Sequence, residues 1–169
     1  QIARVSGMGT QENPALATSV SSTIGSSGGT VSAGGTEASP DASVVIPANA
    51  LGGDTSITVD LETENSNVAT NGIRRIAGPA AKSYSKVVEV TPHGQSFSSA
   101  VSLTFKLSGS VAGTCPADLK VYKSNSDSGT WYQLPDNLWS CSSGAITISA
   151  TSFSRYQAIG GSNTMARSK

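Results

Sequence analysis

Apolar and polar residues alternate along much of the chain with the two-residue period of a β-strand. The alternation is clearest in residues 55–63, TSITVDLET, and in residues 101–107, VSLTFKL. A strand of this kind buries one face and leaves the other in water, so it needs a second sheet to cover its apolar side. The pattern therefore predicts sheets that pack face to face.

Residues 87–107 lie at the centre of the predicted fold. Two alternating runs, 87–90 and 101–107, flank a turn-rich stretch that contains Pro92 and Gly94. We expect these runs to form a pair of strands whose common apolar face is covered by another sheet.

Shorter runs separated by turn residues predict the remaining strands. They occupy residues 30–33, 42–47, 119–123, 130–134, 145–149 and 153–159. Together with the three runs above they give about nine short strands, and no segment has the period of a helix. This spacing is typical of an all-β fold, a two-sheet antiparallel β-sandwich.

The chain divides into an extended N-terminal arm (1–23), the sandwich (24–160) and a polar C-terminal tail (161–169). The arm alternates from residue 15 onward, and no turn folds it back. It is either a leader or short edge strand of the same domain, or a strand lent to a neighbouring molecule. In the second case Leu16, Val20 and Ile24 are the assembly residues, buried on the neighbour.

Composition and charge narrow the class of protein. Only 13% of residues are charged and the net charge is zero, whereas a protein that binds nucleic acid or an anionic membrane has a basic bias. Ser and Thr make up about a quarter of the chain, which favours a secreted or cell-surface protein. No apolar run reaches the roughly 20 residues of a membrane span, so we expect no membrane insertion.

The two cysteines, Cys115 and Cys141, allow a disulfide or two buried thiols. The extracellular type of composition favours the disulfide, which would stabilise the fold by roughly 3 kcal/mol. Two cysteines and one histidine cannot build an ordinary structural zinc site, and we expect no metal or cofactor.

Several motifs together resemble the ZU-five β-sandwich domain of ankyrins, netrin receptors, zonula-occludens proteins and bacterial surface proteins. They are GGTV (28–31), VVIPANAL (44–51), ITVDL (57–61), VEVTPHGQSF (88–97), VSLTF (101–105) and TSFSRYQAI (151–159). The resemblance covers residues 24–160 and implies a binding or structural module.

A subset of that family cleaves itself at a His-Phe-Ser tripeptide. The matching positions are Ser152, Phe153 and Ser154, so the nucleophile is kept but the histidine is replaced. A serine hydroxyl does not titrate near neutral pH and cannot act as the base. His93 stands in a Pro-His-Gly turn, where we expect a bond to nearby backbone. The sequence thus predicts no enzyme.

Two functions remain open. The first is a non-enzymatic extracellular structural or adhesive module, a filament or surface-array subunit that associates with itself or another surface protein through the arm. The alternative is a carbohydrate- or protein-ligand-binding module, with Trp131, Tyr132 and Trp139 as a stacking platform for a glycan. Packing of these aromatic rings in a core or interface is the competing interpretation, and the loop 65–82 is another candidate binding region.

Overall fold

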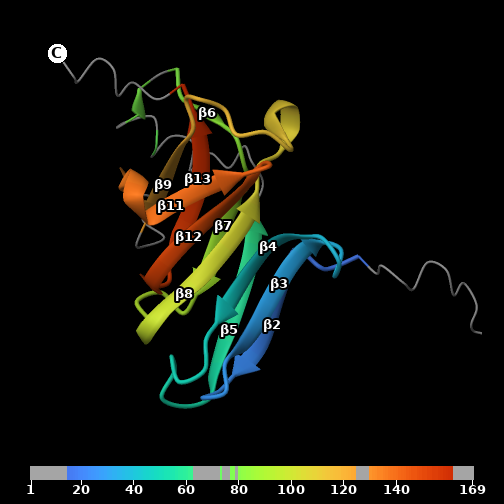
Figure 1. Cartoon of the computed structure of the whole chain (residues 1–169), viewed down its shortest axis with the longest axis vertical. Coiled ribbons are helices and arrows are strands. Elements are labelled where there is room, and N and C mark those ends of the chain that lie inside the picture. The colour runs from blue at the N-terminus through green and yellow to red at the C-terminus, as the bar shows by residue number, and fades with distance from the viewer. Residues whose placement is uncertain (1–14, 63–72, 74–76, 79, 125–129, 162–169) are drawn as a thin grey trace, which may run out of the picture.

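The protein is a sandwich of two antiparallel β-sheets, as the sequence predicts (Figure 1). The computed structural model describes residues 15–62, 73, 77, 78, 80–124 and 130–161. Seven strands form one sheet and five form the other. Two short 3-10 helices, Gly109–Val111 and Asp136–Leu138, lie in the connections. No helix among the described residues has the length and apolar character needed to cross a membrane.

The seven-stranded sheet contains the first and last described strands of the chain. Its order is β10 (Trp131–Gln133), β9 (Lys120–Ser124), β13 (Arg155–Gly160), β7 (Val87–Thr91), β5 (Thr55–Glu62) and β2 (Ser19–Ile24), and β6 (Lys82–Ser83) also pairs with β13. The five-stranded sheet has the order β11 (Trp139–Ser142), β12 (Ala145–Ser152), β8 (Ser96–Lys106), β4 (Pro40–Ile46) and β3 (Gly29–Gly35).

The predicted pairing of the central runs is wrong, although both runs are strands. β7 belongs to the seven-stranded sheet and β8 to the five-stranded sheet, because the turn after Thr91 carries the chain across the end of the sandwich. Their inward residues, such as Val90 and Leu103, belong to the same core. Alternation gives the buried face of a strand but does not identify the strand beside it.

The main core lies between the sheets, and the alternation places it correctly. In β5 the residues Ile57, Val59 and Leu61 are buried while their neighbours are partly or fully exposed, and β8 shows the same pattern. Residues of both sheets meet in this single cluster. Burial of each large aliphatic side chain contributes roughly 1.5–3 kcal/mol before ordering costs.

A second apolar cluster lies on the other face of the seven-stranded sheet. It consists of Ile73, Ala77, Ala81, Val87, Tyr122, Trp131 and Ile159. This sheet is therefore covered on both faces near β13, and all six residues of β13 are buried.

Two strands are not predicted from the sequence, and several predicted strand boundaries differ from those in the structure. β6 has only two residues, and β11 alternates over only four, WSCS, so both strands are too short for the pattern to identify them. β8 begins at Ser96, earlier than the predicted residue 101.

The sandwich begins before the predicted residue 24. An isolated bridge joins Ala15 to Thr36, and Ser19–Ile24 is strand β2 of the seven-stranded sheet. Residues 1–14 and 162–169 lie outside the described residues.

Candidate functional site

The residues predicted to form an assembly arm attach to both sheets of their own molecule. The N–H of Leu16 donates to the carbonyl oxygen of Gly35 in β3 (2.9 Å), and the N–H of Leu61 in β5 donates to that of Thr18 (2.8 Å). β2 then pairs with β5 over six residues. In the structure, residues 15–24 therefore lie along the edge of their own domain. This is the first of the two alternatives that the sequence leaves open for the arm.

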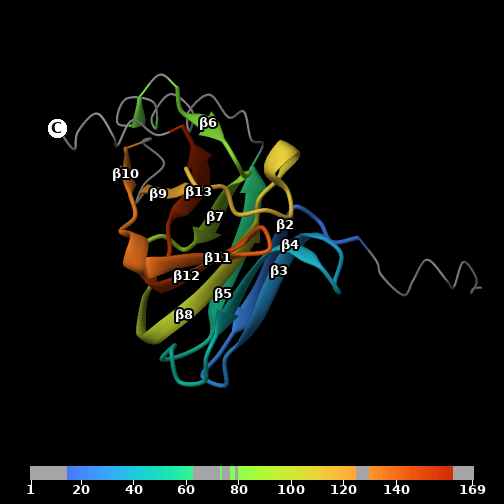
Figure 2. The same cartoon turned by 45° about the horizontal axis from the view of Figure 1, so that its top comes forward.

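β2 is held mainly by its backbone. Of its six side chains only Ile24 is buried, with 6% exposed, while Val20 is partly buried against the main core. The other four are Ser or Thr and are exposed. β2 and β3, the edge strands of the two sheets, lie side by side on one flank of the molecule (Figures 1 and 2).

A row of side chains crosses the outer face of the seven-stranded sheet from edge to edge. Cross-strand partners define it, and we call it the outer row. It runs Trp131, Ser124, Arg155, Glu89, Asp60 and Ser19. The first three residues are buried, the two acids are partly buried and Ser19 is exposed. The row therefore passes from a covered half near β10 to an open half near β2.

Arg155 organises the charges of the outer row. One guanidinium nitrogen lies 2.9 Å from Oε1 of Glu62, and the guanidinium carbon lies 5.6 Å from the centre of the Trp131 ring. Asp60 and Glu89 face each other directly, a pairing of like charges that destabilises a sheet unless a cation compensates it. Arg155, the opposite cross-strand partner of Glu89, supplies that cation.

Three acids of this region approach closely enough to hold a metal ion. Oxygen atoms of Asp60, Glu62 and Glu89 lie within 4.8 Å of one another, and carboxylate oxygens suit Ca²⁺ or Mg²⁺. Arg155 already offsets part of their charge, and Nε2 of His93 lies 3.0 Å from Oε2 of Glu89. These contacts join the three acids to Arg155 and His93 in one polar network, and the absence of a metal stays a prediction.

Nε2 of His93 therefore lies beside a carboxylate, a contact that the sequence does not predict, and the predicted bond from His93 to nearby backbone stays a prediction. It lies in the turn after β7, four residues beyond Glu89. The sequence offers no signal for this contact, because the turn must first fold back over the sheet.

A second polar site anchors the end of β13. The hydroxyl of Tyr84 donates to the carboxylate of Asp118 (2.9 Å), which also accepts the N–H of Gly161 (3.0 Å). Burial acts to raise the pKa of Asp118, but the hydrogen bonds from Gly161 and Tyr84 outweigh it, so this pKa is lowered. Burial and the same carboxylate raise the pKa of Tyr84. A Cβ at Gly160 would collide with the Tyr84 ring, so the site requires a glycine there.

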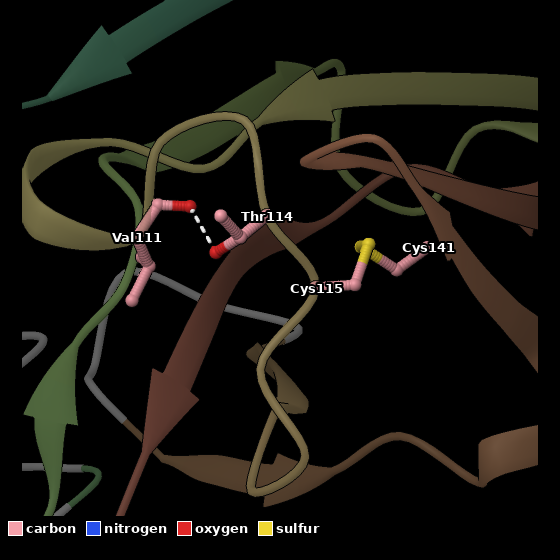
Figure 3. The surroundings of a disulfide bond; sticks show 4 residues. All are labelled: Val111, Thr114, Cys115 and Cys141. Atoms are coloured by element: carbon pink, nitrogen blue, oxygen red, sulfur yellow. Dashed lines mark hydrogen bonds between the residues drawn. A yellow bond between two sulfur atoms is a disulfide. The ribbon is translucent and has the colours of Figure 1, made fainter.

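The predicted disulfide between Cys115 and Cys141 is confirmed (Figure 3). Cys115 lies in the connection before β9, and Cys141 lies in β11. The bond therefore joins a segment leading into the seven-stranded sheet to an edge strand of the five-stranded sheet. Beside it, the hydroxyl of Thr114 donates to the carbonyl oxygen of Val111 (2.8 Å).

The tripeptide Ser152-Phe153-Ser154 lies where the chain passes from β12 to β13, between the two sheets. Phe153 is buried, with its ring centre 4.7 Å from that of Phe97, and Ser154 is fully buried. The carbonyl oxygen of Ser154 accepts the N–H of Val90 (3.0 Å). The three residues occupy a tightly packed junction.

The three aromatic residues proposed as a glycan platform do not share a surface. Trp131 is buried in the second cluster, Trp139 packs partly buried against the main core, and Tyr132 is 41% exposed. The prediction that Trp131 and Tyr132 point to opposite faces of their strand is confirmed. Most of the loop 65–82 lies outside the described residues, although its Ile73, Ala77 and Ala81 belong to the second cluster.

No protein-family model matches this chain, and no curated protein matches it. The resemblance to the ZU-five domain therefore rests on the sequence motifs and remains a hypothesis.

Proposed function

We propose that this chain is a non-enzymatic structural or adhesive module of the cell exterior that associates with itself by exchanging β2 between copies. The observation that carries the proposal is the way β2 is attached. It fills a sheet edge through main-chain hydrogen bonds and buries only one side chain, Ile24.

Exchange of such a strand costs little contact energy. A β2 from a second copy would form the same six backbone pairs with β5 and bury the same isoleucine. Exchange of an identical element between copies is a low-cost route to oligomers. An open chain of exchanges, in which each copy gives β2 and accepts another, would produce a filament.

Composition and covalent structure support a place outside the cell. The disulfide indicates a non-cytoplasmic compartment, because thiols stay reduced in the cytosol. The neutral, Ser- and Thr-rich composition and the resemblance to a family of binding and structural modules agree with an extracellular location.

A pair of engineered cysteines tests the exchange. The hydroxyl oxygens of Ser21 in β2 and Thr58 in β5 lie 2.6 Å apart, and directly opposite residues of antiparallel strands can be bridged. In S21C/T58C an exchanged β2 would link different chains covalently. We expect a ladder of dimers and larger species on a non-reducing denaturing gel, collapsing to monomer with reductant.

S32C/S43C is the matched control. The hydroxyls of Ser32 and Ser43 lie 3.0 Å apart in β3 and β4, which are joined by the short link 36–39 and do not exchange in this proposal. It should run as a single chain. If S21C/T58C forms its bond within single chains at all protein concentrations, exchange of β2 is excluded. Negative-stain microscopy of the unmodified protein should show filaments, and a strictly monomeric protein at high concentration would exclude self-association.

A further inference from the structure

A pocket of about 320 Å³ opens between the two sheets near the ends of β5 and β8. Its apolar lining comes from both sheets, with Leu61 and Val88 on one side and Phe105 and Leu107 on the other. All four side chains belong to the main core. They are only 1–9% exposed, so they form the buried floor of the pocket, and its exposed wall includes Ala112.

Three charged residues complete the lining: Asp41, Lys86 and Lys106. Within the described part of the chain, the ammonium group of Lys106 bonds only to the backbone and hydroxyl oxygens of Ser39, which are neutral. Neither lysine forms an ion pair with another described residue. With two cations and one anion, the pocket has an excess of positive charge.

A hydroxyl of the pocket wall also lacks a partner. Ser108 lines the pocket, and its side-chain oxygen is buried without a hydrogen bond from or to a described residue. An unpartnered buried hydroxyl costs about 1–3 kcal/mol. A ligand acceptor that reached this group would remove that cost.

We propose that this pocket binds a small amphiphile with a short apolar body and an anionic head, such as a medium-chain carboxylate. The apolar body would lie against Leu61 and Phe105, and the head would face Lys86 and Lys106. The volume is at the lower end of small-molecule sites, which limits the ligand to a short chain or a single ring. Apolar surface with a few convergent polar groups is the usual composition of such sites.

Isothermal titration calorimetry of the full chain with octanoate tests this proposal. Octanol and octyltrimethylammonium have the same apolar chain with a neutral or a cationic head. We expect octanoate to bind at least about tenfold more tightly than either. Equal affinities for the three probes, or no binding of octanoate up to its solubility limit, would overturn the proposal.

Two variants locate the binding site. K86E reverses one of the pocket charges and should weaken octanoate binding about tenfold, whereas K120E makes the same charge change at a lysine outside the pocket and should change it less than twofold. A112W places a large ring on an exposed wall residue and should abolish binding, whereas A48W, at an exposed turn elsewhere, should not.

Thermal unfolding of A112W and A48W checks that both variants fold. Octanoate binding that survives in both K86E and A112W would contradict the assignment. If octanoate fails to bind and A112W instead changes the oligomeric state, the pocket is a contact between copies and the small-ligand proposal is wrong. Lys86 and Ala112 lie outside β2 and β5, so this test and the cysteine test of strand exchange can fail independently.

Discussion

The two sheets differ in what they present on their outer faces. The five-stranded sheet carries short hydroxyl pairs, such as Ser32 with Ser43 at 3.0 Å and Thr104 with Thr147 at 3.3 Å, and its Val45 is 47% exposed. The seven-stranded sheet carries the outer row and the second apolar cluster, with Trp131 and Arg155 buried. The outer face of the five-stranded sheet is exposed to water, whereas that of the seven-stranded sheet is partly covered by a second core.

This difference explains why alternation describes one sheet better than the other. A strand with one wet face must alternate, as β8 does. A strand covered on both faces has no such constraint, and β13 reads RYQAIG with every residue buried. A polar residue within a covered strand then needs a partner, and Gln157 donates to the hydroxyl of Ser83 (2.7 Å) and to the carbonyl oxygen of Ser85 (3.0 Å).

Truncation of an outer-face side chain should give the largest difference in unfolding free energy between the two sheets. W131A removes the largest member of the second cluster and should lower the free energy of unfolding by about 3–5 kcal/mol. V45A, on the outer face of the other sheet, should lower it by less than about 0.5 kcal/mol. Urea unfolding with the disulfide intact measures both. A W131A cost as small as that of V45A would show that the second cluster is not a core.

Loss of Arg155, the cation of the outer row, should have the second-largest effect on the free energy of unfolding. R155L leaves Glu62, Glu89 and Asp60 without their buried compensating charge and should cost about 3 kcal/mol. K120L breaks the more exposed pair of Lys120 with Asp136, which lies at 2.9 Å, and should cost at most about 1 kcal/mol. Equal costs in urea unfolding would mean that Arg155 is paired but not effectively buried.

The same Ser-to-Ala change should have different costs in the two environments. Ser85 is fully buried and its hydroxyl accepts the N–H of Ala158 at 2.9 Å, so S85A should lower the free energy of unfolding by about 1–3 kcal/mol. S32A alters a partly exposed hydroxyl pair and should cost less than about 0.5 kcal/mol. Hydrogen exchange adds a local measurement, because the amide of Ala158 should lose protection only in S85A.

The smallest effect concerns alkaline pH. Burial raises the pKa of Tyr156 to about 12 from 10.0. Because the folded-state pKa is higher, this stabilisation is complete below pH 10 and is lost as the pH rises from about 10 towards 12. Between pH 8 and pH 11 the wild type should lose about 1 kcal/mol more than Y156F does. An unchanged pH dependence in Y156F would show that Tyr156 ionises normally in the folded protein.

The part of the structure that the sequence predicts is the part determined within single strands. The buried face of β5 follows from a two-residue period over eight residues, and the opposite faces of Trp131 and Tyr132 follow from adjacency alone. The disulfide follows from composition and the presence of only two cysteines.

The outer row could not be predicted, because it depends on the order of strands that are distant in the sequence. Arg155 meets Ser124 and Glu89 only because β13 lies between β9 and β7. One signal was present: Val87-Val88 and Ala158-Ile159 are consecutive apolar pairs in β7 and β13. Such pairs indicate strands covered on both faces, and both strands border the second cluster.

The disulfide also determines how the molecule would respond to tension along its chain. Cys115 and Cys141 are 26 positions apart in the sequence, and the segment between them includes β9 and β10. A pull on the two ends of the chain would pass through the sulfur bridge instead of through these strands. The fully stretched chain would be shorter by about 90 Å than its reduced form. A subunit carrying load in a filament would thereby keep β9 and β10 outside the force path.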